Sequence, residues 1–324
     1  MSDTVFLTGA SGFVGGHVAD ALLERGYEVR ALVRNGNAEH LRGRAQLVRG
    51  SLLATGALVP HLRGCRYLVH TAALYSFAPR DRRHMRQVNV MGTSGLLEAA
   101  RIAGVERAVV TSSSAAVGPA RNGRPADESD WADPHHGTWG YHASKVEQER
   151  AALAGRTPVV TVLPTAPIGP RDRRPTPTGR MVLDLMRGRV PAYLGGGMNV
   201  VDVRDAARAH VLALERGRPQ ERYLAGGANL TLAELFGSIA AAAGRPAPRM
   251  RMPYPLALVA AAADEARVAV MGGDPAVPLE GVRMGRLRMF STSAKAELEL
   301  EYRPSPIDAA IHASVRWYAD NGYA

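Results

Sequence analysis

The fold of this chain follows from the stretch Thr8-Gly9-Ala10-Ser11-Gly12-Phe13-Val14-Gly15. The stretch completes a short apolar strand, Val5–Thr8, and leads into a helix predicted over 12–25. Gly9 permits a tight turn, Gly12 lets the backbone approach a phosphate, and Gly15 lets the helix pack closely on the strand. Because a helix N-terminus attracts anions, this spacing predicts a loop that binds the pyrophosphate of a dinucleotide.

The same order of strand and helix repeats along the first half of the chain. Strands are predicted at 27–33, 46–49, 66–70, 107–111 and 159–163, and helices at 81–103 and 144–154. Alternation of this kind predicts an α/β fold, a Rossmann-type doubly wound parallel sheet. A helix at 203–215 and a strand at 222–225 follow.

Prolines and glycines accumulate after Pro164 and mark a loop that leaves the sheet. The remainder is mostly helical and predicts a smaller C-terminal substrate domain. We expect residues 1–165 with about 200–227 to form the dinucleotide-binding domain. Residues from about 166–199 and 228–324 would then bind substrate, at the carboxyl edge of the sheet where such folds hold ligands.

The end of the second strand points to the cofactor. It reads Val29-Arg-Ala-Leu-Val-Arg-Asn35, with Arg34 at its tip and no acid. A carboxylate at this place usually binds the ribose 2′-hydroxyl of NAD, whereas arginine accommodates the 2′-phosphate of NADP. The sequence therefore favours NADP(H), with NAD(H) as the alternative if Arg34 is only an exposed residue of an arginine-rich chain.

Tyr141 and Lys145 stand four residues apart at the start of a predicted helix, hence on one face. An ammonium favours phenolate and brings the pKa of tyrosine closer to neutrality, which suits proton transfer. Lysine is otherwise rare, since Lys295 is the only other one in the chain. Hydroxyls after the fifth strand, Ser112 to Ser114, are candidates to polarise a substrate oxygen, and spacing alone does not choose among them.

The composition narrows the class of protein. The chain has 324 residues and a net charge of +10, but its arginines are spread evenly and no basic run is interleaved with aromatics, so we expect no nucleic-acid partner. The single Cys65 excludes an internal disulfide and suits a reducing, cytoplasmic setting. Histidine spacing predicts no metal site. No membrane span is expected, because charges interrupt the apolar stretch 254–271. Ordinary helix packing is the favoured interpretation of this stretch, and a helix lying on a membrane or a lid over an apolar substrate is the alternative.

Several motifs together resemble one family. They are TGASGFVGGHV (8–18), HTAA (70–73), VNVMGT (88–93), TSSSAAVG (111–118) and YHASK (141–145). They are similar to the extended short-chain dehydrogenases/reductases, the NAD-dependent epimerase/dehydratase superfamily. VRALVR (29–34) resembles the dihydroflavonol 4-reductase branch. The stretches 167–180, 221–232 and 277–304 resemble the hopanoid-associated sugar epimerase group, so the likeness covers nearly the whole chain.

The resemblance implies roles for named residues. Tyr141 corresponds to the family's catalytic acid/base, Lys145 to its partner, and Ser113 to the residue that binds the substrate oxygen, with Ser114 as the fallback. The positions implied to contact the cofactor are Gly9, Ser11, Gly12, Phe13, Val14, Gly15, Arg34, Ser51, Leu52, Thr71, Ala72, Ala73, Tyr141, Lys145, Pro164 and Ile168. Ser51 departs from an Asp common in relatives. Ser114 and Ala115 replace the acids of the dehydratases, which argues against water elimination.

We therefore expect an NADP(H)-dependent oxidoreductase that reduces a ketone or aldehyde, on a sugar-like or hopanoid-linked substrate. The alternative is a nucleotide-sugar or hopanoid-associated sugar epimerase that retains NAD, with arginines of 171–180 available for a diphosphate. A non-catalytic NADP-binding protein is disfavoured because Tyr141 and Lys145 are both present. The resemblance also implies a homodimer through the helices near 81–103 and 138–154.

Overall fold

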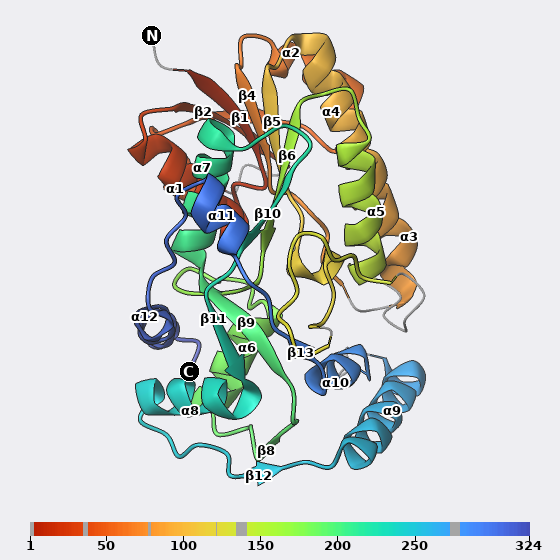
Figure 1. Cartoon of the computed structure of the whole chain (residues 1–324), viewed down its shortest axis with the longest axis vertical. Coiled ribbons are helices and arrows are strands. Elements are labelled where there is room, and N and C mark those ends of the chain that lie inside the picture. The colour runs from red at the N-terminus through yellow and green to blue at the C-terminus, as the bar shows by residue number, and fades with distance from the viewer. Residues whose placement is uncertain (1–2, 35–37, 77–78, 121, 134–140, 273–278) are drawn as a thin grey trace.

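The computed structural model describes residues 3–34, 38–76, 79–120, 122–133, 141–272 and 279–324. A seven-stranded sheet, entirely parallel, forms the upper part of the molecule in Figure 1. Its strands are β1 (Thr4–Thr8), β2 (Glu28–Val33), β3 (Gln46–Arg49), β4 (Tyr67–His70), β5 (Arg107–Thr111), β6 (Val159–Pro164) and β10 (Arg222–Ala225).

The order across this sheet is β10-β6-β5-β4-β1-β2-β3. The direction of winding reverses between β1 and β4, because β2 and β3 extend to one side of β1 while β4, β5 and β6 extend to the other. In open α/β sheets, ligands bind in the crevice beyond the carboxyl ends of the strands at such a reversal.

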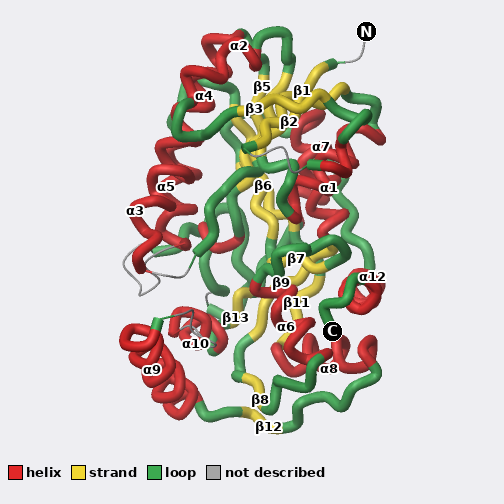
Figure 2. Tube along the Cα trace, turned by 180° about the vertical axis from the view of Figure 1, so that it is seen from behind, coloured by secondary structure: helices red, strands yellow, loops and turns green. Residues whose placement is uncertain are grey.

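Helices cover both faces of the sheet (Figures 1 and 2). On one face lie α1 (Phe13–Glu24) and α7 (Val203–Arg216), which pack against each other. On the other lie α2 (Val59–Leu62), α4 (Gly92–Ala103) and α5 (Tyr141–Leu153). Side chains alternate along a strand, so each buried strand contributes side chains to two cores, one on each face of the sheet.

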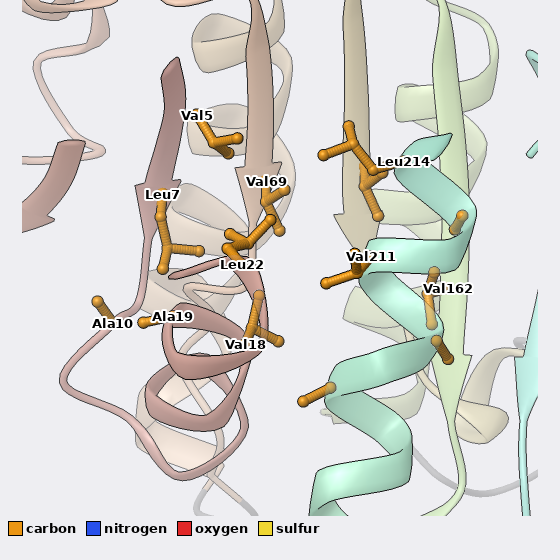
Figure 3. Packing of buried hydrophobic residues seen from close by; sticks show 14 of the residues in the cluster. Val5, Leu7, Ala10, Val18, Ala19, Leu22, Val69, Val162, Val211 and Leu214 are labelled. Carbon is orange, nitrogen blue, oxygen red and sulfur yellow. The ribbon is translucent and has the colours of Figure 1, made fainter. Parts of the chain in front are cut away.

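Strand β1 shows this division residue by residue. Val5 and Leu7 pack with Leu22 of α1 and Leu214 of α7 (Figure 3). Phe6, between them in sequence, belongs instead to the core that includes residues of α2 and α4. The continuous apolar run at the start of the chain is thus explained by burial on both faces.

The lower part of the molecule carries a small second sheet and a group of helices (Figure 1). Its short strands are β7 (Ala166–Ile168), β9 (Gly197–Asp202), β11 (Ala228–Thr231) and β13 (Arg288–Met289), and a separate pair is β8 (Ala192–Tyr193) with β12 (Met250–Arg251). Its helices are α6 (Pro177–Met186), α8 (Leu232–Ala243), α9 (Tyr254–Met271), α10 (Leu279–Gly285) and α12 (Ile307–Asp320), whereas α11 (Ala294–Glu299) packs on β10 of the large sheet.

The Rossmann-type α/β fold expected from the sequence is confirmed, and each predicted strand of the large sheet forms within one residue of its expected bounds. The single helix expected over 81–103 differs. It consists of α3 (Arg82–Met85), one turn of π-helix at Arg86–Met91, and α4. The π turn contains Asn89, whose side chain bonds the backbone of Leu74 in both directions, at 2.7 and 2.9 Å.

From the sequence we expect neither a membrane span nor a metal site. Within the described ranges, no helix is both long enough and apolar enough to cross a membrane. Among the same residues, no group of three or more His, Cys, Asp or Glu side chains is placed to hold a metal ion.

Candidate active site

The glycine loop between β1 and α1 has the geometry that a dinucleotide needs. Gly9 has φ +79°, and a Cβ there would lie 2.5 Å from Thr71 Oγ1 and 2.6 Å from the amide nitrogen of Ala72. A Cβ at Gly15 would collide with the carbonyl oxygen of Gly9. At Gly12, by contrast, a Cβ would meet only that oxygen, at 3.1 Å, so the space in front of the loop is open.

The first turn of α1 faces this open space. Gly12 is its N-cap, no side chain caps the helix, and no acidic residue lies in the first turn. Ser11 and Gly12 are exposed, and Phe13 and Val14 begin the helix. The free N–H groups and the helix dipole therefore fit the pyrophosphate of a dinucleotide.

A hollow of about 560 Å³ lies beyond the ends of β2 and β3. It is lined by Arg34, Arg49, Gly50, Ser51, Ala54, Ala57, Leu58 and His61. No carboxylate is among these residues, and Arg34 is exposed at the tip of β2. Arg34 was expected here from its place after the second strand, whereas Arg49 and His61 were not, because Arg49 depends on the register between β2 and β3 and His61 on the placement of α2.

The other residues expected at the cofactor lie close to this edge but differ in what they do. The Ser51 hydroxyl accepts the amide of Leu53 at 3.1 Å, and Leu52 packs against Gly92 of α4. The Thr71 hydroxyl donates to the carbonyl of Thr8 at 2.7 Å, which ties β4 to β1. Ala72 and Ala73 continue this segment, Pro164 ends β6, and Ile168 is buried in the core of the lower part.

Three consecutive serines follow β5, and the structure separates them. Ser113 hydrogen-bonds the hydroxyl of Tyr141 and also accepts the amide of Ala115 at 3.1 Å. The hydroxyl of Ser112 instead donates to the carboxylate of Glu149 at 2.9 Å, on the buried side. Of the hydroxyls that spacing left open, Ser113 is therefore the one that the structure brings to Tyr141.

Tyr141 and Lys145 share the first turns of α5, with Lys145 almost fully buried. The Lys145 ammonium donates to the carbonyl of Thr111 at 2.8 Å and to Gln148 Oε1 at 2.6 Å. Burial lowers the pKa of Lys145 to about 7, against an opposing effect of Glu149. Burial raises the pKa of Tyr141 to about 12, although the hydrogen bond with Ser113 opposes that rise.

This differs from the simple expectation that an ammonium draws the pKa of tyrosine down. In the structure, burial has the larger effect on both groups, and the ammonium faces the carbonyl of Thr111. The phenol accordingly holds its proton at neutral pH, and it is a proton donor rather than a base in this state.

A chain of buried hydrogen bonds connects Lys145 with the first strand. Gln148 donates from Nε2 to Thr93 Oγ1 at 2.9 Å, and Thr93 Oγ1 lies 2.9 Å from His70 Nε2. The other ring nitrogen of His70 lies 2.7 Å from Thr8 Oγ1. Burial lowers the pKa of His70 to about 3, so the imidazole is neutral and links the two hydroxyls. Neither Gln148 nor Thr93 was expected from the sequence as a site residue.

A buried ion pair lies behind the same helix. The guanidinium of Arg222, on β10, contacts both carboxylate oxygens of Glu149, at 3.0 and 3.1 Å. The side chains of Arg222 and Glu149 are 8% and 0% exposed, so this pair is shielded from water. Thr161 on β6 also donates to Glu149, at 2.8 Å. Four bonds therefore fix Glu149, since Ser112 supplies the fourth.

The lower part of the molecule closes the other side of the site. Tyr75 packs on Tyr141 with ring centroids 4.4 Å apart, and burial raises its pKa. His142 Nδ1 lies 3.4 Å from Glu280 Oε1 of α10, and both side chains are largely buried. Within the described part of the chain neither atom has a hydrogen-bond partner. The lower part therefore places the Glu280 carboxylate against the residue that follows Tyr141.

The arginines proposed for a diphosphate are not equivalent. Arg171 is bound to Asp20 of α1 at 2.6 Å and to His17, so it ties the loop after β7 to the cofactor helix. Arg180 on α6 lies close enough to Tyr75 to lower its pKa. Arg173 and Arg174 are exposed.

Together, the glycine loop, the reversal of strand order and the Ser–Tyr–Lys group define a nicotinamide-dependent enzyme of the short-chain dehydrogenase/reductase type. The chain belongs to the NAD dependent epimerase/dehydratase family, whose family model matches residues 5–226. The extended short-chain dehydrogenase/reductase assignment made from the motifs is confirmed.

Similar proteins carry names of more than one activity. A Synechocystis sp. protein provisionally named as a dihydroflavonol 4-reductase is 39% identical, with 100% of this chain and 96% of that protein covered. Sterol demethylase protein B of Methylococcus capsulatus is 32% identical, with coverage of 98% and 99%. The crystal structure of a nucleoside-diphosphate-sugar epimerase from Pseudomonas aeruginosa has a TM-score of 0.82 and 27% identity, with coverage of 100% and 99%.

Proposed function

We propose that this protein is an NADPH-dependent reductase of a ketone or aldehyde, with Ser113, Tyr141 and Lys145 as its catalytic residues. The observation that carries the proposal is the hydrogen bond between Ser113 and the protonated phenol of Tyr141 at the carboxyl edge of the sheet. A protonated donor beside a second hydroxyl suits a carbonyl oxygen that gains negative charge during reduction.

The chain's own residues then have separate tasks. The bound cofactor supplies the hydride. Ser113 donates a hydrogen bond to the carbonyl oxygen as negative charge develops there, and Tyr141 gives that oxygen its phenolic proton. Lys145, held in place by Thr111 and Gln148, provides the positive charge that stabilises the tyrosinate left behind.

Preference for NADPH rests on Arg34. The hollow beside it contains a second guanidinium, Arg49, and lacks a carboxylate that would repel a 2′-phosphate. We expect Arg34→Asp to lower the ratio of kcat/KM for NADPH to that for NADH by about 10- to 100-fold, since a charge-assisted hydrogen bond contributes roughly 1.5–3 kcal/mol. Steady-state kinetics with both cofactors measures this ratio.

The matched control for that variant is Arg156→Asp, which makes the same change at another exposed arginine, directly after α5. It should leave the ratio as it is. An unchanged ratio in Arg34→Asp would contradict the NADPH preference and return NAD(H) as the cofactor.

The sugar epimerase is the second candidate, and the similarity to a nucleoside-diphosphate-sugar epimerase supports it. Such an enzyme oxidises and re-reduces one carbon, so it keeps its NAD, whereas a reductase exchanges its cofactor after each turnover. Native mass spectrometry of the purified protein distinguishes the two. Retained NAD(H) would favour the epimerase, and an empty protein that binds added NADPH would favour the reductase.

For the substrate we propose a carbonyl on a sugar-like or hopanoid-linked molecule. The relative named sterol demethylase protein B and the apolar helix α9 support an apolar, polycyclic component. The homodimer and the cytoplasmic setting that the sequence favours stay predictions.

The pH dependence of the reaction should report on Lys145. Its pKa of about 7 means that the ammonium form, which supports proton donation, is lost as pH rises through 7. We expect kcat/KM for NADPH, which reflects ionisations of the free enzyme, to fall above that pH. In Gln148→Glu a carboxylate would replace an amide oxygen 2.6 Å from the ammonium. It should raise the pKa of Lys145 and move the fall upward by about one pH unit or more.

Glu147→Gln serves as the control because Glu147 lies on the same helix and pairs with Arg86 on the exposed side. Its pH profile should match that of the unchanged protein. A profile in Gln148→Glu that keeps its original midpoint would exclude Lys145 as the titrating group.

A further inference from the structure

Helix α9 exposes an apolar face to the surroundings. Only Ala257 and Ala261 of its 18 residues are buried, and they pack against Val282 of α10. On the outer side, Val259 and Val270 are 67% and 87% exposed. The exposed apolar residues of the helix are Pro255, Leu256, Val259, Ala260, Ala262, Ala263, Ala266, Ala269, Val270 and Met271. Figures 1 and 2 place α9 at the outer corner of the lower part.

The charged side chains of α9 have partners within the protein. Arg267 pairs with Asp264 at 2.6 Å, within the helix. Glu265 accepts the amide of Leu279 at 2.9 Å and so faces α10. Scattered single apolar residues on a surface need no explanation, but a row along a whole helix marks an interaction surface.

Exposed arginines flank the apolar face, on the segment before α9 and on and after α10. Residues 245–272 and 279–290 contain seven arginines and three acids. Two of the acids, Asp264 and Glu265, have the partners just described, and the third, Glu280, lies against His142. Arg249, Arg251, Arg283 and Arg286 are exposed, and Arg286 stacks on Tyr254 at the start of α9, with its guanidinium carbon 4.7 Å from the ring centroid. This corner of the molecule is therefore apolar at its centre and positively charged at its rim.

We propose that the outer face of α9, with Arg249 and Arg283 at its rim, docks on an anionic lipid bilayer surface. An amphipathic helix with arginines beside its apolar side chains binds the interface through buried apolar area and attraction to anionic headgroups. The charge pattern selects this occupant over a second copy of the chain, because a symmetric contact would bring the arginine rim of one copy against that of the other.

The position of α9 gives this docking a consequence for the site. Its inner side packs on α10, and α10 carries Glu280 to within 3.4 Å of His142, the residue next to Tyr141. The same pair of helices thus touches the bilayer on one side and the candidate active site on the other. Docking would therefore bring the candidate active site close to the bilayer surface, although the docking itself does not depend on the proposed function.

Vesicle co-sedimentation of the full chain tests the proposal, without any need for turnover. We expect binding to vesicles of phosphatidylcholine with phosphatidylglycerol and little binding to phosphatidylcholine alone. Val259→Asp/Val270→Asp should reduce the bound fraction at least tenfold, since two charges enter the buried face. Arg249→Gln/Arg283→Gln should weaken binding to the anionic vesicles about thirtyfold.

Matched controls lie elsewhere on the surface. Leu298→Asp changes another exposed apolar residue, on α11, and Arg63→Gln/Arg156→Gln removes two exposed arginines from the large-sheet part; both should bind like the unchanged protein. Absence of binding to anionic vesicles, or unchanged binding by Val259→Asp/Val270→Asp, would overturn the proposal. Light scattering gives a further test. If the unchanged protein is a dimer without lipid and Val259→Asp/Val270→Asp is a monomer, the outer face of α9 binds a second copy and the proposal is overturned.

Discussion

Tyr141→Phe should lower kcat for carbonyl reduction by about 10²–10⁴-fold and leave the Kd for NADPH nearly unchanged. Phenylalanine keeps the ring that packs on Tyr75 at a centroid distance of 4.4 Å, so the shape of the site is preserved. Only the hydroxyl that bonds Ser113 is removed. Stopped-flow reduction under single-turnover conditions, together with fluorescence titration of NADPH, separates the two quantities.

Two further variants make the result decisive. Tyr67→Phe removes a hydroxyl at the start of β4, where the ring packs on Tyr27 far from the site, and should retain full activity. Tyr75→Phe in the Tyr141→Phe background asks whether the neighbouring phenol supplies any residual rate. Full activity in Tyr141→Phe alone would remove Tyr141 from the proposed mechanism.

The parts of the fold that the sequence predicted are those fixed by local pattern. Gly9, Gly12 and Gly15 required only a strand before them and a helix after them, and the structure gives each the close approach or open space expected. The alternation of short apolar strands with helices determined the large sheet in the same way. Tyr141 and Lys145 could be placed together because they stand four positions apart on one helix.

The parts that the sequence missed depend on pairing between distant segments. Glu149 meets Arg222 only because β10 lies beside β6, and Glu280 meets His142 only because α10 folds back over α5. No local signal distinguishes these charged residues from exposed ones. The small sheet of the lower part was missed for a related reason, since its strands are too short to show a period.

The difference in the pKa of Tyr141 also has a structural reason. Spacing predicts that an ammonium is near the phenol but not how deeply either is buried. In the fold, the carbonyl of Thr111 and the amide of Gln148 hold Lys145 inside the protein, and burial then dominates both pKa values. Thr111 lies at the end of β5, 34 residues before Lys145, and the packing of α5 on the sheet sets the depth of burial, so sequence spacing could not supply the sign.

Glu149→Leu should cause the largest loss of stability among single changes near the site, about 3–5 kcal/mol in the free energy of unfolding. The change leaves the guanidinium of Arg222 buried without its carboxylate. It also removes the acceptor of the hydrogen bonds from the hydroxyls of Ser112 and Thr161. Natural domains are stable by only about 5–15 kcal/mol, so the loss is a large share of the total. Urea unfolding followed by circular dichroism measures it as a lower midpoint.

Glu147→Leu is the control, because it makes the same substitution two positions away on α5. It breaks an exposed ion pair between Glu147 and Arg86. Exposed pairs contribute little to stability, so its midpoint should hardly move. Glu149→Leu/Arg222→Met should recover part of the lost stability, since a buried ion pair can be replaced by apolar residues when both partners go. Recovery should stay incomplete because Arg222 also donates to the carbonyls of Glu128 and Asp130, at 2.6 and 2.9 Å. Equal midpoints for Glu149→Leu and Glu147→Leu would show that the buried pair does not hold α5 against the sheet.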